Sequence, residues 1–563
     1  MARSLYTNPS QPKTHEGATR YNIQNPLIDL TFTKGSVLFQ DGFYQTQQDE
    51  LNGFIKALLA AENYESGFGW KYGAYARDPK KGKGNRIQGS VIPAILTAHY
   101  PEHTDYIEEY VFKCLQHRPD DVIAYVAHLE NMGLIRLKDM PTIVKKSLAQ
   151  TLASFDDYQL LKYSRTQVNR SELRKNGSVK SLRLVDVLGL CKNELDPRMK
   201  NIYSFLHQST RKRNYNLWEI AEWQHVLFST TEINNDAVNK GRPSVSQMLS
   251  THKNTRNAWQ ALLNAHLLPD MALLLNIRNM IKAGFTLNEL GTIIENRQFK
   301  GIWPHQIYAG YKAVVKGETK KKEGSNTSYP HYDEIFEIML LKIVEDFLPP
   351  LRSLGFGDVS GSMSTFISKG SKTRLLDVAK VLCACIAATS GYAATFSDEG
   401  YIASIEGYKG PLDMVLNAPE MQKGYGSTQV YGAVIDTIKY IKQHHIPPFK
   451  VLYFFSDMQF HPPKGEGGPS FGGNRIPPLE TAIQNYQANL NETPLIVLWN
   501  LSSYEGAPLS CEYPGVCMVS GYDTRTFQAV KEWINNGGRT ISRSKVTGKD
   551  EQMAELLDYI RSF

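Results

Sequence analysis

The stretch Phe-Gly-Asp-Val-Ser-Gly-Ser-Met-Ser-Thr at residues 356–365 constrains the fold of this chain more than any other. It places Asp358, Ser360 and Ser362 on a loop that directly follows a short predicted strand. A helix is predicted after Arg374, because apolar residues recur there at helical spacing. In open α/β sheets, sites form where such loops leave the carboxyl ends of parallel strands. The stretch therefore predicts an α/β fold with a site at that edge of its sheet.

Two later positions complete the pattern. Thr428 follows Gly426-Ser427, and Asp457 lies at the end of an apolar run whose composition predicts a buried parallel strand. Carboxylates and hydroxyls are hard oxygen ligands that suit Mg²⁺. The alternative interpretation is that the aspartate and serines only cap the following helix. We predict one divalent-cation site, with Mg²⁺ as its ion, formed by Asp358, Ser360, Ser362, Thr428 and Asp457.

Length and composition exclude several classes of protein. At 563 residues the chain is too long for one core, so two or more domains are expected. It has no run of eighteen apolar residues, and its N-terminus lacks the apolar core of a signal peptide. The six cysteines show no zinc-site or disulfide spacing, which favours a reducing cytoplasm. Cys511 and Cys517 are close enough in sequence to pair, but in that compartment free thiols are the favoured interpretation.

Charge is distributed unevenly along the chain. Residues 1–350 carry 44 Lys and Arg against 36 Asp and Glu, whereas the remainder carries 19 against 20. Residues 151–213 alone hold 13 basic and 6 acidic residues. Such a concentration raises the local potential for a polyanion. The alternative is a solvated helix face.

Hydrophobic periodicity predicts two kinds of architecture. Residues 1–25 are polar and are predicted to form a flexible tail. From residue 47 to about 312, short amphipathic helices predict a stacked helical array. A polar flexible loop is predicted at 316–328, followed by a helix at 333–347. The predicted helices of the array are 50–61, 90–98, 105–115, 121–131, 140–152, 182–190, 218–229, 257–265, 269–282 and 287–296.

The C-terminal part alternates strands and helices, which predicts a doubly wound parallel sheet. A long Gly/Pro loop at 459–478 follows Asp457. The predicted strands are 354–357, 392–396, 451–455, 495–501 and 516–520, and the predicted helices are 430–443, 524–535 and 549–560.

The five polar positions resemble the metal-ion-dependent adhesion site of von Willebrand factor A domains. In that family the two serines, the threonine and the aspartates hold Mg²⁺, some of them through water, and a partner carboxylate often fills a remaining position. Phe396-Ser397-Asp398-Glu399 and Gly521-Tyr522-Asp523-Thr524 also match this family. The resemblance covers about residues 350–563.

The N-terminal part resembles the TROVE module, and its pairing with an A domain is similar to the Ro autoantigen family and its bacterial orthologs. The matching stretches are residues 155–165, 182–190, 273–280 and 302–307, together with Trp259. The resemblance implies an α-helical, HEAT-like repeat ring (TROVE) at 26–345, followed by an α/β Rossmann-like A domain at 346–563. It further implies that single-stranded 3′ ends of misfolded RNA thread the ring, that Y-type non-coding RNA binds its outer surface, and that an exoribonuclease is a partner.

Basic and aromatic residues in the N-terminal part are candidate contacts for the RNA that the resemblance implies. Lysine and arginine neutralise phosphates, and an aromatic ring can stack on an unpaired base. Tyr163 is one such candidate for stacking on a base, and the alternative is that its ring packs in the core. Lys162, Tyr163 and Arg165 match the family's basic motif, and Arg170, Arg174, Lys175, Lys180 and Arg183 extend it.

Two further basic stretches are candidate phosphate contacts. One is the Gly/Pro loop at 77–86, which lacks the Walker pattern of a nucleotide-binding loop. Its two interpretations are a contact with the phosphate backbone of RNA and a solvated loop. The other is predicted to bind the outer-surface RNA. The first stretch contributes Arg77, Lys80, Lys81 and Arg86, and the second contributes Arg211, Lys212 and Arg213.

No metalloprotease zinc motif and no Walker motif is present in the sequence, so we do not expect an enzyme. We expect a cytoplasmic, monomeric RNA-binding ring protein that acts in RNA quality control or maturation. One alternative is a metal-dependent adaptor whose A domain captures an acidic partner. Another is a Mg²⁺-dependent phosphoryl-transfer enzyme with Asp358 as nucleophile.

Overall fold

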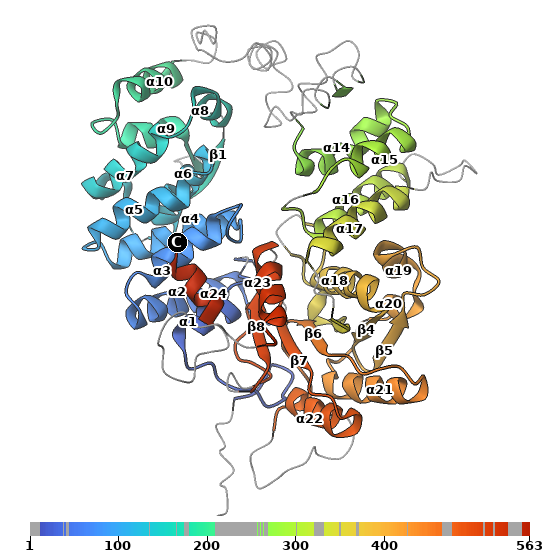
Figure 1. Ribbon diagram of the computed structural model, residues 1–563. Helices are drawn as coiled ribbons and strands as arrows, with labels where there is room; N and C mark the ends of the chain where they lie inside the picture. The colour runs from blue at the N-terminus through green and yellow to red at the C-terminus, as the bar shows by residue number, and fades with distance from the viewer. Residues whose placement is uncertain are drawn as a thin grey trace, which may run out of the picture. The chain divides into compact units, whose positions relative to one another are not determined.

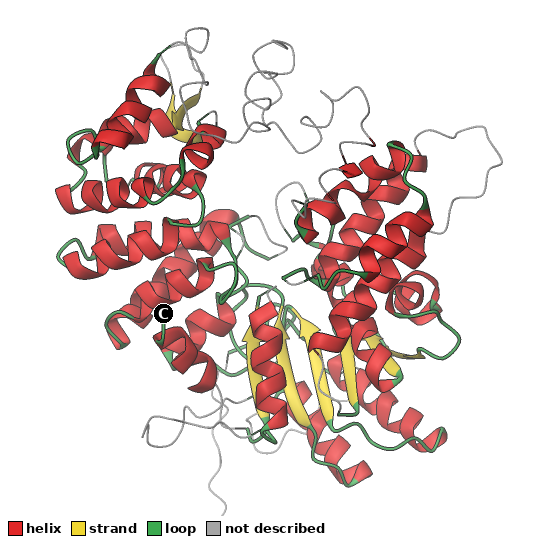
Figure 2. Ribbon diagram, turned by 45° about the horizontal axis from the view of Figure 1, so that its top comes forward, coloured by secondary structure: helices red, strands yellow, loops and turns green. Residues whose placement is uncertain are grey.

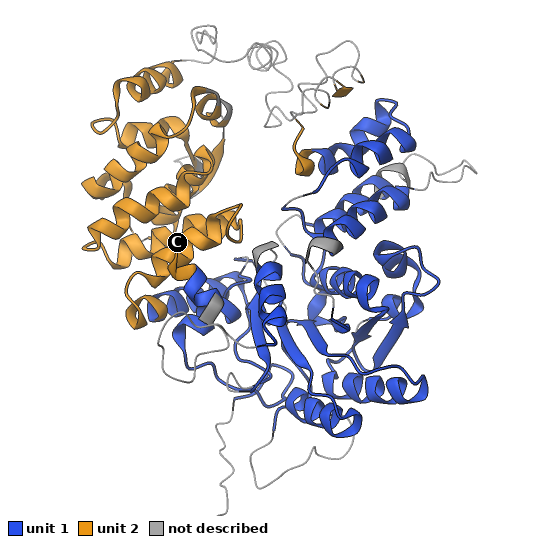
Figure 3. Cartoon of the chain, in the orientation of Figure 1, with its two compact units in different colours: residues 1–60, 273–559 blue, residues 61–272, 560–563 orange. Residues whose placement is uncertain are grey.

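The chain folds into two compact units, one of residues 1–60 and 273–559 and one of residues 61–272 and 560–563 (Figure 3). Each unit is described here by itself. The computed structural model describes residues 12–563 except 38, 41–43, 134, 165, 174–178, 209–255, 257–258, 261–262, 264–267, 300, 320–331, 348–350, 368–370, 425, 464–475, 510–512, 522–523 and 539–553.

The second unit is a stack of short helices, as the periodicity predicted (Figure 1). Within it α3 packs against α4 and α5, α4 against α6, and α5 against α7. Fully buried aromatic side chains, among them Trp70, Tyr72 and Tyr125, fill the space between them. The helices are α3 (Phe68–Arg77), α4 (Arg86–His99), α5 (Thr104–Leu115), α6 (Pro119–Asn131), α7 (Thr142–Ala153), α8 (Asp157–Tyr163), α9 (Leu184–Leu190) and α10 (Pro197–His207).

A β-hairpin interrupts this helical stack, which the sequence did not predict. Strand β1 (Gln167–Leu173) pairs antiparallel with β2 (Val179–Arg183), and β1 packs against α6. The hairpin carries part of the basic stretch at 151–213, so that part is not the helix face that the alternative interpretation assumed. The predicted helix at 182–190 consequently begins only at Leu184. The predicted helix at 218–229 and most of the one at 257–265 lie outside the described residues.

Helices from both halves of the sequence belong to the first unit. The helix α16 continues through Thr319, so the predicted loop at 316–328 begins later than expected, and its remainder lies outside the described residues. The other helices are α1 (Pro26–Ile28), the π-helix η1 (Asp29–Thr33), α2 (Gln47–Tyr64), α14 (Asp270–Lys282), α15 (Leu287–Glu295), α16 (Pro304–Thr319) and α17 (Tyr332–Phe347).

The boundary between compact units differs from the predicted domain boundary at 345/346. Helix α16 packs against α18, and α17 packs against both α18 and α19 of the sheet-containing part. The buried carboxylate of Glu337 on α17 also accepts hydrogen bonds from the N–H groups of Leu412 and Asp413. These contacts join the helices after residue 273 to the A domain as one packed body.

A six-stranded sheet forms the centre of the first unit (Figure 2). Its strand order is β5-β4-β3-β6-β7-β8, and every neighbouring pair is parallel except β4 with β5. The sequence predicted a doubly wound parallel sheet but not the edge strand β5, which a tight connection folds back antiparallel on β4. The strands are β3 (Ser353–Asp358), β4 (Tyr392–Phe396), β5 (Gly400–Ser404), β6 (Val451–Ser456), β7 (Leu495–Asn500) and β8 (Val516–Ser520).

Helices flank this sheet as in a doubly wound fold. Helices α18 and α23 both contact α17, whereas α21 and α22 pack against each other. Close packing of α18 on β3 requires small residues in the strand, because a Cβ at Gly355 would lie 3.0 Å from the Cys383 sulfur. The helices are α18 (Leu375–Ser390), α19 (Pro411–Asn417), α20 (Pro419–Gln422), α21 (Val430–Gln443), α22 (Pro478–Leu490), α23 (Thr524–Asn535) and α24 (Ala554–Arg561).

Residues 12–21 form a segment that is bound to the A domain, although the sequence predicted a flexible tail over 1–25. Lys13 pairs with Thr19 in an isolated antiparallel bridge, and Tyr21 pairs with Ala507. The hydroxyl of Tyr21 donates to Glu480 on α22 at 2.6 Å. Residues 1–11 lie outside the described part of the chain. We call residues 12–21 the N-terminal strap.

Candidate functional site

The two predicted aspartate ligands meet at the point where the sheet reverses its strand order. Asp358 is the last residue of β3, and Asp457 directly follows β6, which pairs with β3 in parallel. The rings of Phe356 and Phe454 stack across these two strands with centroids 4.8 Å apart. Both carboxylates are fully buried at this edge. Ligands commonly bind at such a switch point, at the carboxyl ends of the strands.

The hydroxyl of Ser456 fixes the carboxylate of Asp358. It donates to Asp358 Oδ2 at 2.5 Å and accepts the N–H of Met458 at 2.9 Å. The other oxygen, Oδ1, accepts the backbone N–H of Ser360 at 2.9 Å. Ser456 was not among the predicted site residues, although it directly precedes Asp457 in the sequence.

Asp457 is left with an unsatisfied oxygen. Its Oδ1 accepts the N–H of Gln459 at 3.1 Å. Its Oδ2 is buried and has no hydrogen-bond partner among the described residues. Burial, followed by the negative charge of Asp358, raises the pKa of Asp457, while burial also raises the pKa of Asp358. Two buried carboxylates with an orphaned oxygen are the environment that a bound cation would neutralise.

Hydroxyl groups surround these carboxylates. The hydroxyls of Ser360 and Ser362 lie 3.3 Å apart, and both side chains are buried. Thr428 is also buried, on a loop joined to the serine loop where Gly361 N–H donates to Gly426 O at 3.3 Å. The structure thus brings the serine loop next to the carboxylates and bonds the Thr428 loop to it.

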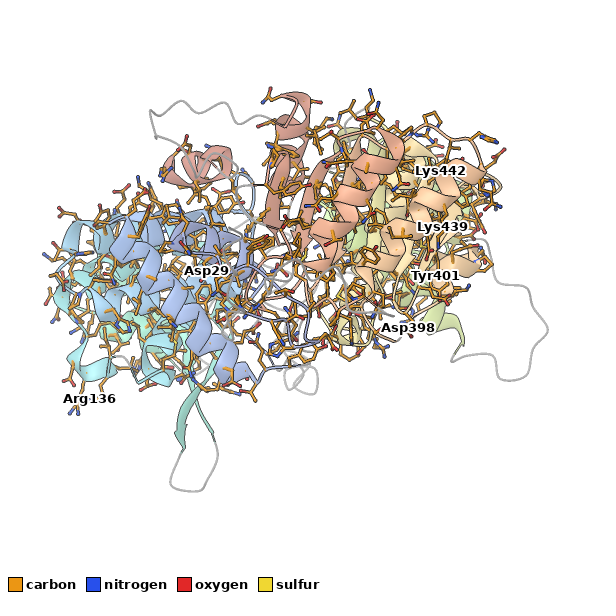
Figure 4. The ribbon with its side chains drawn as sticks, turned by 90° about the horizontal axis from the view of Figure 1, so that it is seen from below. Asp29, Arg136, Asp398, Tyr401, Lys439 and Lys442 are labelled. Atoms are coloured by element: carbon orange, nitrogen blue, oxygen red, sulfur yellow. The ribbon has the colours of Figure 1, made fainter. Side chains whose placement is uncertain are left out.

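The loop of Thr428 is held from two sides. Asp398, which follows β4 and is labelled in Figure 4, accepts the hydroxyl and the N–H of Ser427 at 2.6 and 3.2 Å. A Cβ at Gly426 would lie 2.1 Å from Asp398 Oδ2, so only glycine allows this approach. His461 accepts the N–H of Thr428 at 2.8 Å. Asp398 and His461 were not predicted as site residues.

The donor set fits a hard divalent cation. It combines two carboxylates with hydroxyl oxygens, one carboxylate oxygen lacks a partner, and Mg²⁺ prefers such oxygens together with water. Across the described ranges, no group of three or more His, Cys, Asp or Glu side chains is arranged to hold a metal. The alternative role of Asp358 as a helix cap is not what the geometry shows, because Arg374 and Asp377 cap α18.

The predicted RNA contacts divide into three groups. Arg77 is the first, and the structure gives it a different role. It is 2% exposed, and its guanidinium donates twice to Asp121 Oδ2, at 2.8 and 2.5 Å. Arg86 binds the same carboxylate through Oδ1 and also binds Asp120. The sequence did not reveal this pairing because the aspartates lie on a different helix.

Lys80 and Lys81 form the second group and are presented to solvent. Both side chains are exposed on the turn between α3 and α4. Asp78 Oδ1 accepts their backbone N–H groups at 2.7 and 2.8 Å, which holds the turn. Gly82 is required within it, since a Cβ there would lie 1.8 Å from Tyr75 O. These two lysines remain candidates for a phosphate contact.

The third group lies on α8 and the hairpin. The ring of Tyr163 packs against the guanidinium of Arg118, which lies 5.1 Å from the ring centroid. Arg183 is exposed and pairs with Asp186 at 3.3 Å, at the start of α9. Lys162 belongs to α8, Arg170 to β1 and Lys180 to β2. Arg165, Arg174, Lys175, Arg211, Lys212 and Arg213 lie outside the described residues.

Comparisons with known proteins support this architecture. Residues 352–555 match the model of a family described as a domain of unknown function, DUF7788. No curated protein sequence matches the chain. The crystal structure of the Ro (RSR) protein of Deinococcus radiodurans is similar, with a TM-score of 0.51 and 13% identity. The match covers 90% of this chain and 99% of that one.

The chain shares the Ro fold. The predicted order of a helical-repeat region followed by a Rossmann-like A domain is therefore confirmed. The hairpin and the antiparallel edge strand of this chain are local departures from the prediction. In the described part of this chain, no helix is both long enough and apolar enough to cross a membrane.

Proposed function

We propose that this protein binds RNA in the manner that the Ro resemblance implies. The single observation that carries the proposal is the shared Ro fold along 90% of the chain. The basic segment at 151–213 supports it, with 13 basic against 6 acidic residues on the helical unit. The exposed Lys80 and Lys81 add positive charge to that unit. Neutralising phosphates with such side chains supplies sequence-independent affinity.

The finer proposal names the RNA and the partners. The helical region closes into a monomeric ring, single-stranded 3′ ends of misfolded RNA enter it, and Y-type RNA binds outside. An exoribonuclease acts with the protein in the cytoplasm during RNA quality control or maturation. The proposal assigns no catalytic step to this chain.

Mg²⁺ at the A-domain site belongs to the same proposal. Asp358 and Asp457 would hold the ion with Ser360, Ser362 and Thr428. When bound, the ion would neutralise buried negative charge and offer a position to an acidic group. The unpaired Asp457 Oδ2 supports this assignment.

A metal-dependent adaptor is the second candidate, because the same orphaned oxygen favours a site that captures an acidic partner. In that case RNA binding would be weak and insensitive to the basic segment. A phosphoryl-transfer enzyme would instead turn over a phosphate ester and lose that activity in Asp358→Ala.

The decisive experiment measures RNA affinity against salt. A duplex with a single-stranded 3′ tail is compared with the same duplex made blunt, for wild type and for Lys162→Ala/Arg165→Ala. We expect tighter binding of the tailed RNA. We also expect a shallower salt slope in the variant, by about 0.7 for each phosphate that its missing side chains no longer neutralise.

The matched control is Lys439→Ala/Lys442→Ala, which removes two exposed lysines from α21 of the other unit (Figure 4). It changes net charge equally but should leave the tail preference intact. Equal affinity for tailed and blunt RNA in wild type would refute threading and favour the adaptor.

A further inference from the structure

The N-terminal strap binds the residues that directly follow the metal-site aspartate. The hydroxyl of Thr14 donates to Phe460 O at 2.7 Å, and the N–H of His15 donates to Gln459 Oε1 at 2.9 Å. Glu16 Oε2 lies 2.6 Å from His461 Nε2. Three consecutive strap residues therefore contact the three consecutive residues 459–461.

A tight turn presents Glu16 at the tip of the strap. Thr14 accepts the N–H of Gly17 at 3.0 Å through its carbonyl and the N–H of Ala18 at 3.0 Å through its hydroxyl. Gly17 has a φ of +90°, a conformation that glycine adopts without steric cost. The turn is thus built independently of the contacts that Glu16 itself makes.

Other side chains hold the tip in place. The ring of His15 stacks on Tyr44 with centroids 4.7 Å apart, and the hydroxyl of Tyr44 donates to Glu16 Oε1. Both oxygens of Glu16 are therefore engaged by groups of the first unit. The Glu16 carboxylate is already held by the turn, Tyr44 and His461. It therefore pays little further conformational entropy when it interacts with a nearby charge.

His461 links Glu16 to a predicted metal ligand. Its Nδ1 accepts the N–H of Thr428 at 2.8 Å, so Nε2 carries the proton and donates to Glu16. Its own backbone N–H donates to Thr428 O at 3.0 Å. A single imidazole thus joins the strap to the loop of Thr428.

Glu16 lies close to the proposed ligands, because it contacts the imidazole that binds Thr428, and its neighbour His15 contacts Gln459, two residues after Asp457. Three carboxylates gathered around one buried site repel one another in the absence of a cation. A bound divalent cation attracts each of the three carboxylates and so offsets their mutual repulsion. Docking of the strap and binding of the cation should therefore favour each other, by the same factor in both directions.

We propose that Glu16 is a third carboxylate of the metal centre, acting on the cation from outside the ligand set, and that the N-terminal strap is thereby a metal-linked clasp on the A domain. This inference rests on the proposed Mg²⁺ site. It adds to that site a carboxylate from the N-terminal part of the sequence and a segment whose docking the ion strengthens.

The test measures Mg²⁺ affinity of the full chain by calorimetry for wild type, Glu16→Gln and Glu480→Gln. Glutamine keeps one oxygen to accept from His461, and its NH2 group can donate to the hydroxyl of Tyr44, so a purely structural role would leave the affinity unchanged. Glu480→Gln is the matched control, because that carboxylate binds Tyr21 at the other end of the strap. We expect about fivefold weaker binding in Glu16→Gln, as one charge acting across a partly solvated site would produce, and no change in Glu480→Gln.

Amide hydrogen exchange of residues 12–21 supplies the second readout. Mg²⁺ should slow exchange there in wild type and have a smaller effect in Glu16→Gln. If wild type binds no Mg²⁺, behaving like Asp358→Ala, both the metal site and the clasp are refuted. If Mg²⁺ binds equally well to wild type and Glu16→Gln and leaves strap exchange unchanged, only the clasp is refuted.

Discussion

The guanidinium of Arg77 lies 2.5 Å from the carboxylate of Asp121, and both side chains are at most 3% exposed. Breaking a buried pair costs about 3–5 kcal/mol when the remaining charge has no other partner; Asp121 keeps Arg86, so the lower end of that range applies. We therefore expect Arg77→Ala to destabilise the protein by about that amount, measured as the free energy of urea unfolding. Lys81→Ala, on the exposed turn that follows, should change it by less than about 0.5 kcal/mol. Similar small losses in both variants would show that the pair contributes little.

Asp457 gives a second prediction, which concerns Mg²⁺ and stability together. A ligand that binds only the folded state at about 100 times its Kd adds about 2.7 kcal/mol. Asp457→Asn should lose this response in thermal melts. Without metal it should be at least as stable as wild type, because one of two neighbouring buried charges is gone.

The control for that experiment is Asp436→Asn, which removes an outer carboxylate of α21 that pairs with Lys439. It should respond to Mg²⁺ as wild type does. An unchanged Mg²⁺ response in Asp457→Asn would place the ion elsewhere.

Glu337 anchors α17 to the start of α19. Its carboxylate accepts the N–H groups of Leu412 and Asp413 at 3.1 and 2.9 Å while being 7% exposed. Glu337→Ala leaves two N–H groups without this acceptor, so we expect a loss of about 2 kcal/mol in urea unfolding. Glu334→Ala, on the exposed surface of the same helix, is the matched control. Equal effects from both would argue against the anchor.

His305 predicts a dependence of stability on pH. Burial lowers its pKa in the folded protein to about 4, and its pKa in the unfolded chain is about 6.5. The folded state therefore excludes a proton that the unfolded state binds. Its contribution to stability is complete above about pH 6.5 and is lost as the pH falls towards 4.

Between pH 8 and pH 5 this difference amounts to about 2 kcal/mol. His305→Gln should show a correspondingly shallower loss of unfolding free energy over that interval. Parallel pH profiles for the two proteins would mean that another group carries the acid sensitivity.

Local patterns in the sequence predicted much of the A domain. Asp358 and Asp457 each stand beside an apolar strand, and parallel strands bring their carboxyl ends to one edge. Helices of the array followed from apolar periodicity, because that signal depends only on neighbours three and four residues away. The hairpin at 167–183 was missed, since its polar and basic residues show no clear alternation.

The roles of charged residues were decided by tertiary structure. Arg77 appeared to be part of an exposed basic loop, but folding buries it against Asp121 on another helix. Glu16 appeared to belong to a tail, but folding sets it against His461, near the opposite end of the chain. By itself the sequence determined most of the helices, most strands of the large sheet and the positions of Asp358 and Asp457 at strand ends, because these depend on local composition and spacing. Only the tertiary structure decided which charges meet, because buried charges need partners and those partners lie far away along the chain.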